Sequence, residues 1–326
     1  MGSLAFTPFL PPITEFEDAD LVRVATSAVS VYSQPSDTSK IVASWKQDEL
    51  VNIYEEITAK TPGYNPIWYR VWGGYMHRAH LQRVRIIYND PAQLIPEKGQ
   101  LGEITVPYSQ SIHHSQKYGW TPTHRLYYGT VHWVVGIDEG PDKQPWYRLR
   151  DELTSVNYNI PAIHLRLIPN EELKPISPEV GFYQKRIEVE ISSQTLTCFE
   201  NDSIVLQTKI SSGIPGASTS GGIPTATPKG DFNIQAKMPS KHMGDGNLTS
   251  DLQAYELVGV PWNCFFTQLG HAFHGAYWHD NFGVPMSHGC INMRIAEAKW
   301  LFLWVMPISE PDKESTNKFG TPIRIF

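Results

Sequence analysis

Residues 271–294 read HAFHGAYWHDNFGVPMSHGCINMR and carry the chemistry from which the rest of the chain can be interpreted. They contain four of the twelve histidines and, near their end, Cys290. Cysteine catalysis requires a thiolate, an imidazole that takes the thiol proton, and donors for a developing oxyanion. Gly289 lets the backbone turn sharply beside the thiol, so that successive N–H groups can face an attacked carbonyl. The stretch therefore predicts a cysteine nucleophile assisted by histidine.

Two other interpretations stay open on these residues alone. A free cysteine is usually a small buried hydrophobe, and a histidine-rich loop can hold a metal. A metal site favours recurring short spacing with a carboxylate or a second cysteine, and here only Asp280 and Cys290 are at hand. We therefore place the metal below the thiolate.

Composition indicates a turn-rich, mainly β protein. The 326 residues include 25 prolines, 24 glycines and 10 tryptophans, and only 18% are charged, which favours strands and turns over long solvated helices. A net charge of -6 gives no electrostatic reason to bind nucleic acid or an anionic membrane. No run approaches the ~18 apolar residues of a membrane helix. Three cysteines exclude a disulfide scaffold.

An internal repeat precedes the histidine-rich region. Its landmarks recur in the same order: Tyr32-Ser33-Gln34 with Tyr108-Ser109-Gln110, Trp68-Tyr69-Arg70-Val71 with Trp146-Tyr147-Arg148-Leu149, and Ala79–Val84 with Ile163–Ile168. Short strands between turn signals predict two small β barrels, at 21–90 and 100–170, after a tail at 1–20. The first copy resembles bacterial SH3-like domains over 68–77, and the second departs from that pattern after Leu149.

A polar, proline-spaced linker at 169–178 leads to a third domain, expected at 184–326. Apolar residues alternate with polar ones from Ile187 to Ile191, which predicts a half-buried strand. One helix is expected from Ile295 to Trp304, and a last strand near the end of the chain. This domain is expected to be mainly β.

His274-Gly275, followed by Ser287-His288-Gly289-Cys290-Ile291-Asn292, resembles the signature of the L,D-transpeptidase catalytic domain, also called the YkuD domain. Thr227–Ile234 and Trp278–Gly283 resemble further motifs of that family. The resemblance covers roughly 184–326 and implies a β-sandwich, here preceded by the two SH3-like barrels.

The resemblance implies a reaction on peptidoglycan. Cys290 attacks the carbonyl between the third stem residue, a diamino acid, and the terminal D-alanine. D-alanine leaves, and the side-chain amine of a second stem takes the acyl group to form a 3→3 cross-link. An L,D-carboxypeptidase, another cysteine hydrolase of the wall, and a wall-binding protein with an inactive site remain alternatives. Carbapenem-type β-lactams are expected inhibitors. The implied acyl transfer needs no metal and no organic cofactor, so none is expected.

The same resemblance implies site residues. The expected catalytic residues are Cys290, His274, His288, Gly289, Ser287 and Gly275. His274 is the expected general base, with His288 second, and the N–H groups of Gly289 and Cys290, with His288, face the oxyanion. The expected substrate contacts are Trp278, His279, Asn292, Arg294 and Met243. For Arg294, a surface salt bridge is an equal alternative.

Wall biogenesis and the control of cell shape take place outside the cytoplasm. We therefore expect an extracytoplasmic protein in the cell wall or at the cell surface. The first residues, Met1-Gly2-Ser3, show no signal peptide, so the export signal or anchor is expected to be missing from this sequence.

Overall fold

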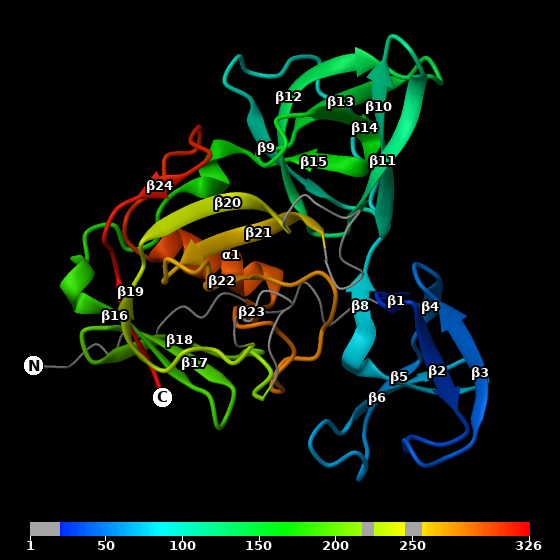
Figure 1. The fold of residues 1–326 in the computed structure, drawn as a ribbon, viewed down its shortest axis with the longest axis vertical. Coiled ribbons are helices and arrows are strands. Elements are labelled where there is room, and N and C mark those ends of the chain that lie inside the picture. The colour runs from blue at the N-terminus through cyan, green and yellow to red at the C-terminus, as the bar shows by residue number, and fades with distance from the viewer. Residues whose placement is uncertain (1–19, 217–224, 245–255) are drawn as a thin grey trace, which may run out of the picture.

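The computed structural model describes residues 20–216, 225–244 and 256–326 (Figure 1). Almost every element in these ranges is a strand, which confirms the prediction of a mainly β protein. The tail expected at 1–20 lies outside the described residues except for Asp20. Among the described residues, no helix has the length and apolar character needed to cross a membrane.

The first β domain comprises residues 21–84 and forms two sheets. Its strands are β1 (Leu21–Val24), β2 (Ala28–Tyr32), β3 (Ile41–Lys46), β4 (Leu50–Asn52), β5 (Glu55–Thr58), β6 (Ile67–Val71), β7 (Gly74–His77) and β8 (Leu81–Val84). One sheet has the order β4-β1-β8 and the other β3-β2-β7-β6-β5. Val22, Val31 and Met76 pack in the core that these strands enclose.

The second β domain comprises residues 100–167 and forms one seven-stranded sheet in the order β11-β10-β14-β13-β12-β9-β15. Its strands are β9 (Gln100–Ile104), β10 (Tyr108–Ser115), β11 (Gly119–Tyr127), β12 (Val131–Glu139), β13 (Pro145–Arg150), β14 (Asn157–Pro161) and β15 (Leu165–Leu167). The repeated Trp68 and Trp146 motifs lie in β6 and β13, and a 3-10 turn precedes the last strand of each copy. The sheets differ between the copies, and the SH3-like assignment stays a prediction.

The C-terminal domain comprises residues 185–325 and builds two five-stranded sheets. The sheets have the orders β18-β17-β16-β25-β19 and β23-β22-β21-β20-β24. Their strands are β16 (Lys185–Glu190), β17 (Thr195–Glu200), β18 (Ser203–Lys209), β19 (Gly230–Asn233), β20 (Ala236–Met243), β21 (Leu257–Phe265), β22 (Ala272–Gly275), β23 (Ile291–Met293), β24 (Thr316–Asn317) and β25 (Pro322–Ile325). Ile187 and Val189 are completely buried, as their alternation predicted.

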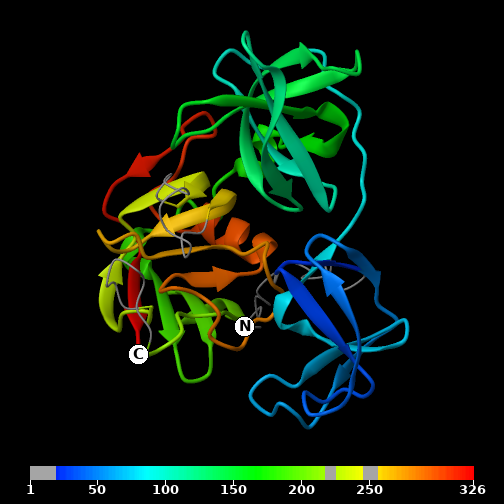
Figure 2. The ribbon, with the colours of Figure 1, turned by 45° about the vertical axis from the view of Figure 1, so that its right-hand side comes forward.

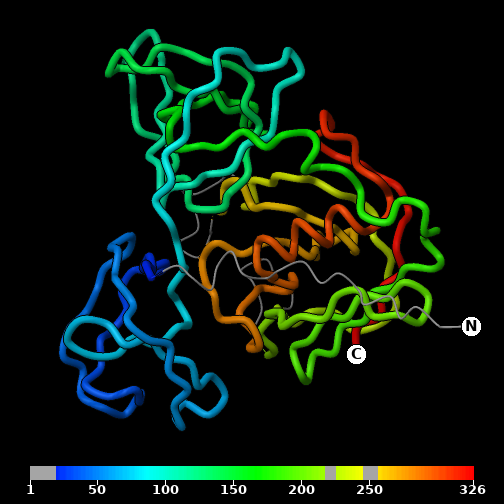
Figure 3. Tube along the Cα trace, turned by 180° about the vertical axis from the view of Figure 1, so that it is seen from behind, coloured from blue at the N-terminus to red at the C-terminus, as the bar shows by residue number. Residues whose placement is uncertain are grey.

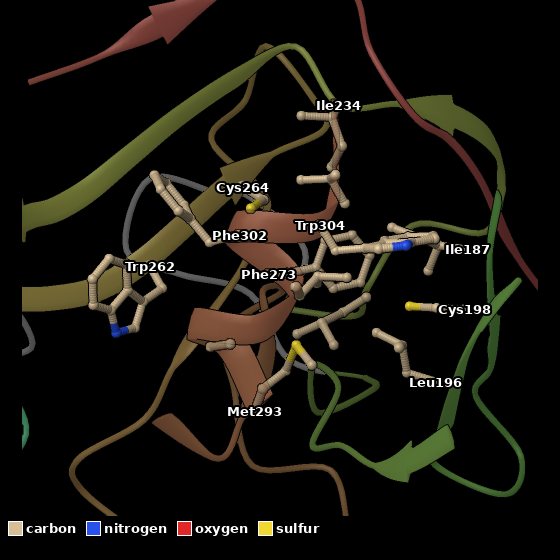
Figure 4. Close-up of a cluster of buried hydrophobic side chains, with 14 of the residues drawn as sticks. Ile187, Leu196, Cys198, Ile234, Trp262, Cys264, Phe273, Met293, Phe302 and Trp304 are labelled. Carbon is tan, nitrogen blue, oxygen red and sulfur yellow. The ribbon is translucent and has the colours of Figure 1, made fainter. Parts of the chain in front are cut away.

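The single α-helix of the described residues, α1 (Ile295–Trp304), packs into the core of this domain (Figure 4). Ala298, Leu301 and Phe302 have the i, i+3, i+4 spacing of one helix face, and all are buried. Cys198 and Cys264 are completely buried in the same cluster, where burial raises the pKa of both thiols. These two cysteines therefore serve packing.

Buried lysines satisfy carbonyls at the end of α1 and just beyond it. Lys185 Nζ donates to the Trp304 carbonyl at 2.8 Å. Lys237 Nζ donates to the carbonyls of Val305 and Pro307 at 3.1 and 2.9 Å. The last carbonyls of a helix lack partners within it, and cations are favourable at that end. The lysines thus fix α1 between the sheets.

Both β domains border the C-terminal domain (Figures 2 and 3). Arg23 of β1 is 1% exposed and donates to Asp48 at 2.9 Å, to Gln82 at 2.8 Å and to the Tyr277 carbonyl at 2.9 Å. Asp48 also accepts from Arg125 of the second β domain at 2.5 Å. A buried ion pair therefore joins all three domains at one point.

The second β domain also contacts β20 directly. His242 Nδ1 lies 2.6 Å from Asp151 and its Nε2 lies 2.7 Å from Glu256, while Lys241 pairs with Glu152 at 3.0 Å. The segment expected as a linker is packed as well, because Leu173 is buried in the core of the C-terminal domain.

Candidate active site

Cys290 lies in the turn that leads into β23. Strands β22 and β23 are parallel, and their register places His274 opposite Asn292. Side chains two residues apart in a strand share a face, so His274 projects on the side of the sheet to which the turn carries Cys290. Both residues line one cavity of ≈ 230 Å³. The cysteine and the histidine singled out from the sequence thus meet at one site.

Ser287 holds the turn around the thiol. Its Oγ donates to the Cys290 carbonyl at 2.5 Å and accepts from the Gly289 N–H at 3.1 Å. Gly289 has a φ of 121°, which side chains with a Cβ rarely adopt. The Ser287 hydroxyl therefore closes a tight turn around Gly289. It also accepts the hydrogen bond of the Gly289 N–H, the donor expected to face the oxyanion.

A second layer of backbone contacts supports this turn. Thr227 Oγ1 donates to the Gly289 carbonyl at 2.9 Å and accepts from the Gly213 N–H at 2.8 Å. A Cβ on Gly213 would approach the Thr225 carbonyl oxygen to 2.0 Å and the Gly289 Cα to 2.9 Å. Only glycine fits there, so the chain at 213 positions the cysteine turn.

The His274 imidazole has a defined orientation. Its Nδ1 lies 3.2 Å from the Gly275 carbonyl, which can only accept, so Nδ1 carries the proton and Nε2 is left as the basic nitrogen. Burial lowers the pKa of His274 to about 4. A Cβ on Gly275 would contact Pro261 and Ile295 at 2.9 and 3.1 Å. Because residue 275 has no side chain, β22 can pack closely against β21 and α1.

Cys290 is partly exposed, and its Sγ lies 3.8 Å from the Gly270 carbonyl. Desolvation raises the pKa of the thiol to about 11, although the Ala272 N–H opposes that shift by favouring the thiolate. The resting pair is therefore a neutral thiol and a neutral imidazole. Such a pair can act when the proton moves to the imidazole during attack.

The other residues of the cavity are mostly apolar. The Trp278 ring lies against the His274 ring at a tilt of 47°, with centroids 5.7 Å apart, and the exposed His288 lines the cavity beside the thiol. Met243 at the end of β20 lines it too. Sequence reasoning missed two lining residues, Leu257 and Met286. Nothing in their local sequence marks them, because the fold alone brings them to the cysteine.

His279 differs from the expectation that it contacts substrate. It is completely buried, its Nδ1 accepts from the Asn281 N–H at 3.1 Å, and its Nε2 lies 2.9 Å from the Asn292 amide. Burial lowers its pKa to about 3. His279 is thus a neutral internal support for β23, and Asn292, also buried, reaches the cavity wall from the same strand.

Arg294 lies away from the cysteine cavity. It contacts Glu297 and Thr208, each at 3.3 Å, and its guanidinium lies over the Phe282 ring. Arg294 therefore forms a salt bridge, but with a buried partner and not on the surface as the alternative had it. In the described part of the chain, no group of three or more potential metal ligands comes together.

Residues 184–325 match the family model of the YkuD L,D-transpeptidase catalytic domain. This part of the chain belongs to the YkuD family. The match covers somewhat less than half of the chain and leaves out both β domains. The comparison with curated proteins gave no match.

Solved structures similar to the chain include several L,D-transpeptidases. One from Mycobacterium smegmatis is 20% identical, with 56% of this chain and 77% of that chain covered and a TM-score of 0.35. A mutant of the Enterococcus faecium enzyme is 25% identical, with 44% and 50% covered and a TM-score of 0.33. The LdtMt1 complex with imipenem is 17% identical, with 60% and 90% covered and a TM-score of 0.35. The family assignment rests on the match at 184–325.

Proposed function

We propose that the YkuD domain is an L,D-transpeptidase in which Cys290 is the nucleophile and His274 the general base. One observation carries the proposal: thiol and imidazole line the same cavity, and the Gly275 carbonyl holds the His274 tautomer whose Nε2 accepts a proton. The donor is a peptidoglycan tetrapeptide stem. The site lies in the cell wall, outside the cytoplasm.

In the first step, the Cys290 sulfur bonds to the carbonyl carbon before D-alanine while its proton passes to His274 Nε2. Because Ser287 occupies the Gly289 N–H, we assign the oxyanion to the N–H of Cys290. Loss of one such donor typically costs ~100–1000-fold in rate. The imidazolium then protonates the departing D-alanine amine, which leaves a thioester on Cys290.

In the second step, the side-chain amine of a diamino acid on another stem attacks the thioester. His274 takes the amine proton and returns it to the sulfur, which restores the thiol and leaves a 3→3 cross-link. Water in place of the amine gives an L,D-carboxypeptidase.

Intact-mass measurement tests this assignment. The protein is incubated with a carbapenem and, separately, with a disaccharide-tetrapeptide. We expect one carbapenem adduct and a tripeptide–tetrapeptide dimer, with both absent from Cys290→Ala. His274→Gln should lose turnover, while the control His288→Gln, at an exposed position beside the thiol, should retain most of it.

The other outcomes separate the alternatives. Release of D-alanine without a dimer identifies a carboxypeptidase. Binding of wall fragments with neither adduct nor turnover identifies a wall-binding protein with an inactive site. Loss of turnover in His288→Gln with full activity in His274→Gln would transfer the base role to His288.

A further inference from the structure

A second cavity, of ≈ 620 Å³, lies between the first β domain and the YkuD domain. Arg78 and Gln82 contribute to one wall, and Arg294 and Glu297 contribute to the other. Its size falls within the ~300–1,000 Å³ typical of ligand pockets. The cavity therefore has the dimensions of a binding site and depends on both domains.

The two cavities share no lining residue; β22 and β23 contribute to the cysteine cavity, and the residues that directly follow these strands contribute to the second one. On the β22 side, His274 lines the cysteine cavity and Ala276 lines the second one. On the β23 side, Asn292 lines the cysteine cavity and Arg294 lines the second one. The second cavity is thus separate from Cys290 but adjoins the strands that carry its partners.

Two charged side chains in this cavity have atoms left without partners. Glu297 is 4% exposed; its Oε1 accepts from Thr208 at 2.7 Å, whereas its Oε2 is buried and, among the described residues, has no hydrogen-bond partner. The Nε of Arg78 is likewise buried without a partner in the described ranges. Buried polar groups are normally paired, because losing water without a replacement costs free energy.

The charges around the cavity are balanced. The wall carries four basic and four acidic side chains: Arg78, Arg83, Lys209, Arg294, Glu56, Glu190, Asp280 and Glu297. A balanced wall disfavours a polyanion or a polycation, since either would face as many like charges as opposite ones. It suits a ligand that carries an ammonium and a carboxylate together.

We propose that this cavity binds a zwitterionic peptide, with an ammonium at the Glu297 carboxylate and a carboxylate at the Arg78 guanidinium. A peptidoglycan stem has this chemistry, and naming it as the peptide rests on the function proposed above. The stem bound here is held at the domain junction and not at the thiol. The first β domain then contributes directly to recognition of the wall.

Calorimetry on the full chain tests the proposal. Cys290 is first alkylated with N-ethylmaleimide, which fills the cysteine cavity whether or not the domain is a transpeptidase. The probe is the synthetic stem tetrapeptide L-Ala-γ-D-Glu-L-Lys-D-Ala. We expect one remaining site, and a Kd that rises about tenfold or more in Arg78→Gln, because a charge-assisted hydrogen bond is lost.

Glu297→Gln keeps the size of the side chain and should weaken binding to a similar degree. Arg70→Gln is the matched control, because Arg70 lies in the same domain, is not part of the cavity wall and has a side chain that is 45% exposed. Amidation of the peptide carboxylates should weaken binding to the unchanged protein but not further to Arg78→Gln. Acetylation of the peptide amines should weaken binding to the unchanged protein but should not weaken binding to Glu297→Gln further.

No binding after alkylation, or equal Kd values for Arg78→Gln and Arg70→Gln, would overturn the proposal and leave a water-filled cavity. D-alanine release by the unalkylated protein is measured in parallel. Release without second-site binding refutes this inference alone. Binding without release refutes the transpeptidase assignment and leaves a zwitterion-binding site.

Discussion

The ionisation state of Cys290 gives the sharpest prediction. Burial raises the pKa of its thiol to about 11 from a reference of 9.0 and lowers the pKa of His274 to about 4. At pH 7 these values correspond to about one thiolate in ten thousand molecules, against about one in a hundred for the reference thiol. Cys290 is partly exposed, so water reduces the desolvation that raises the pKa of its thiol. We expect alkylation at pH 7 to be about ten- to a hundredfold slower than for a free thiol.

Iodoacetamide labelling followed by intact mass measures this rate between pH 5 and 10.5. Only one addition is expected, because Cys198 and Cys264 are completely buried. The rate should rise tenfold per pH unit from 6 to beyond 9, since the thiolate fraction rises in that proportion below the pKa. His274→Gln should leave this slope unchanged, because the resting thiol carries its own proton.

A rate that reaches a plateau between pH 5 and 8 would refute the reasoning. Such a plateau is the behaviour of a preformed thiolate–imidazolium pair, in which the cysteine pKa lies well below neutrality. Enzymatic turnover would then start from the ion pair, and the proton transfer described above would already be complete before substrate binds.

Three further predictions concern the framework of the site. Gly213→Ala should lower stability by about 3 kcal/mol by overpacking the cysteine turn, with carbapenem acylation lost, as thermal unfolding and intact mass will show. Ion pairing with Asp151 and Glu256 raises the pKa of His242. The stability that this pairing adds to the fold is therefore fully present at low pH and is lost as the pH rises through the raised pKa. His242→Gln should lower Tm at pH 5 more than at pH 9. Arg23→Ala removes one partner of a buried ion pair and should cost about 3–5 kcal/mol, measured by denaturant unfolding, whereas Arg70→Ala should cost under about 1 kcal/mol.

Much of the site could be predicted from the sequence because its chemistry is local. Cys290, Ser287 and Gly289 lie within four residues, and hydrogen bonds within the turn hold them together, although Gly213 and Thr227 support it from outside. His274 followed from the family motif, and the parallel register of β22 with β23 brings it to the cavity.

The predictions about substrate contacts and about sheet order were less successful, because both depend on packing between distant segments. His279 was expected at the substrate and is buried against Asn292, since exposure cannot be read from residue type. Arg294 faces the second cavity and not the cysteine. The repeat placed equivalent motifs on equivalent strands, but the sheets differ, because sheet order depends on long-range pairing. The ion pairs between domains left no pattern in the sequence.

The pairing of β16 with β25 has a consequence for how the protein is made. Ile187 lies opposite Ile323, and β25 is an interior strand between β16 and β19. The first sheet of the domain therefore stays open until residues 322–325 have been synthesised and can pair with both neighbours. A chain that stops before β25 lacks an internal strand of this sheet and should be unfolded and sensitive to proteolysis.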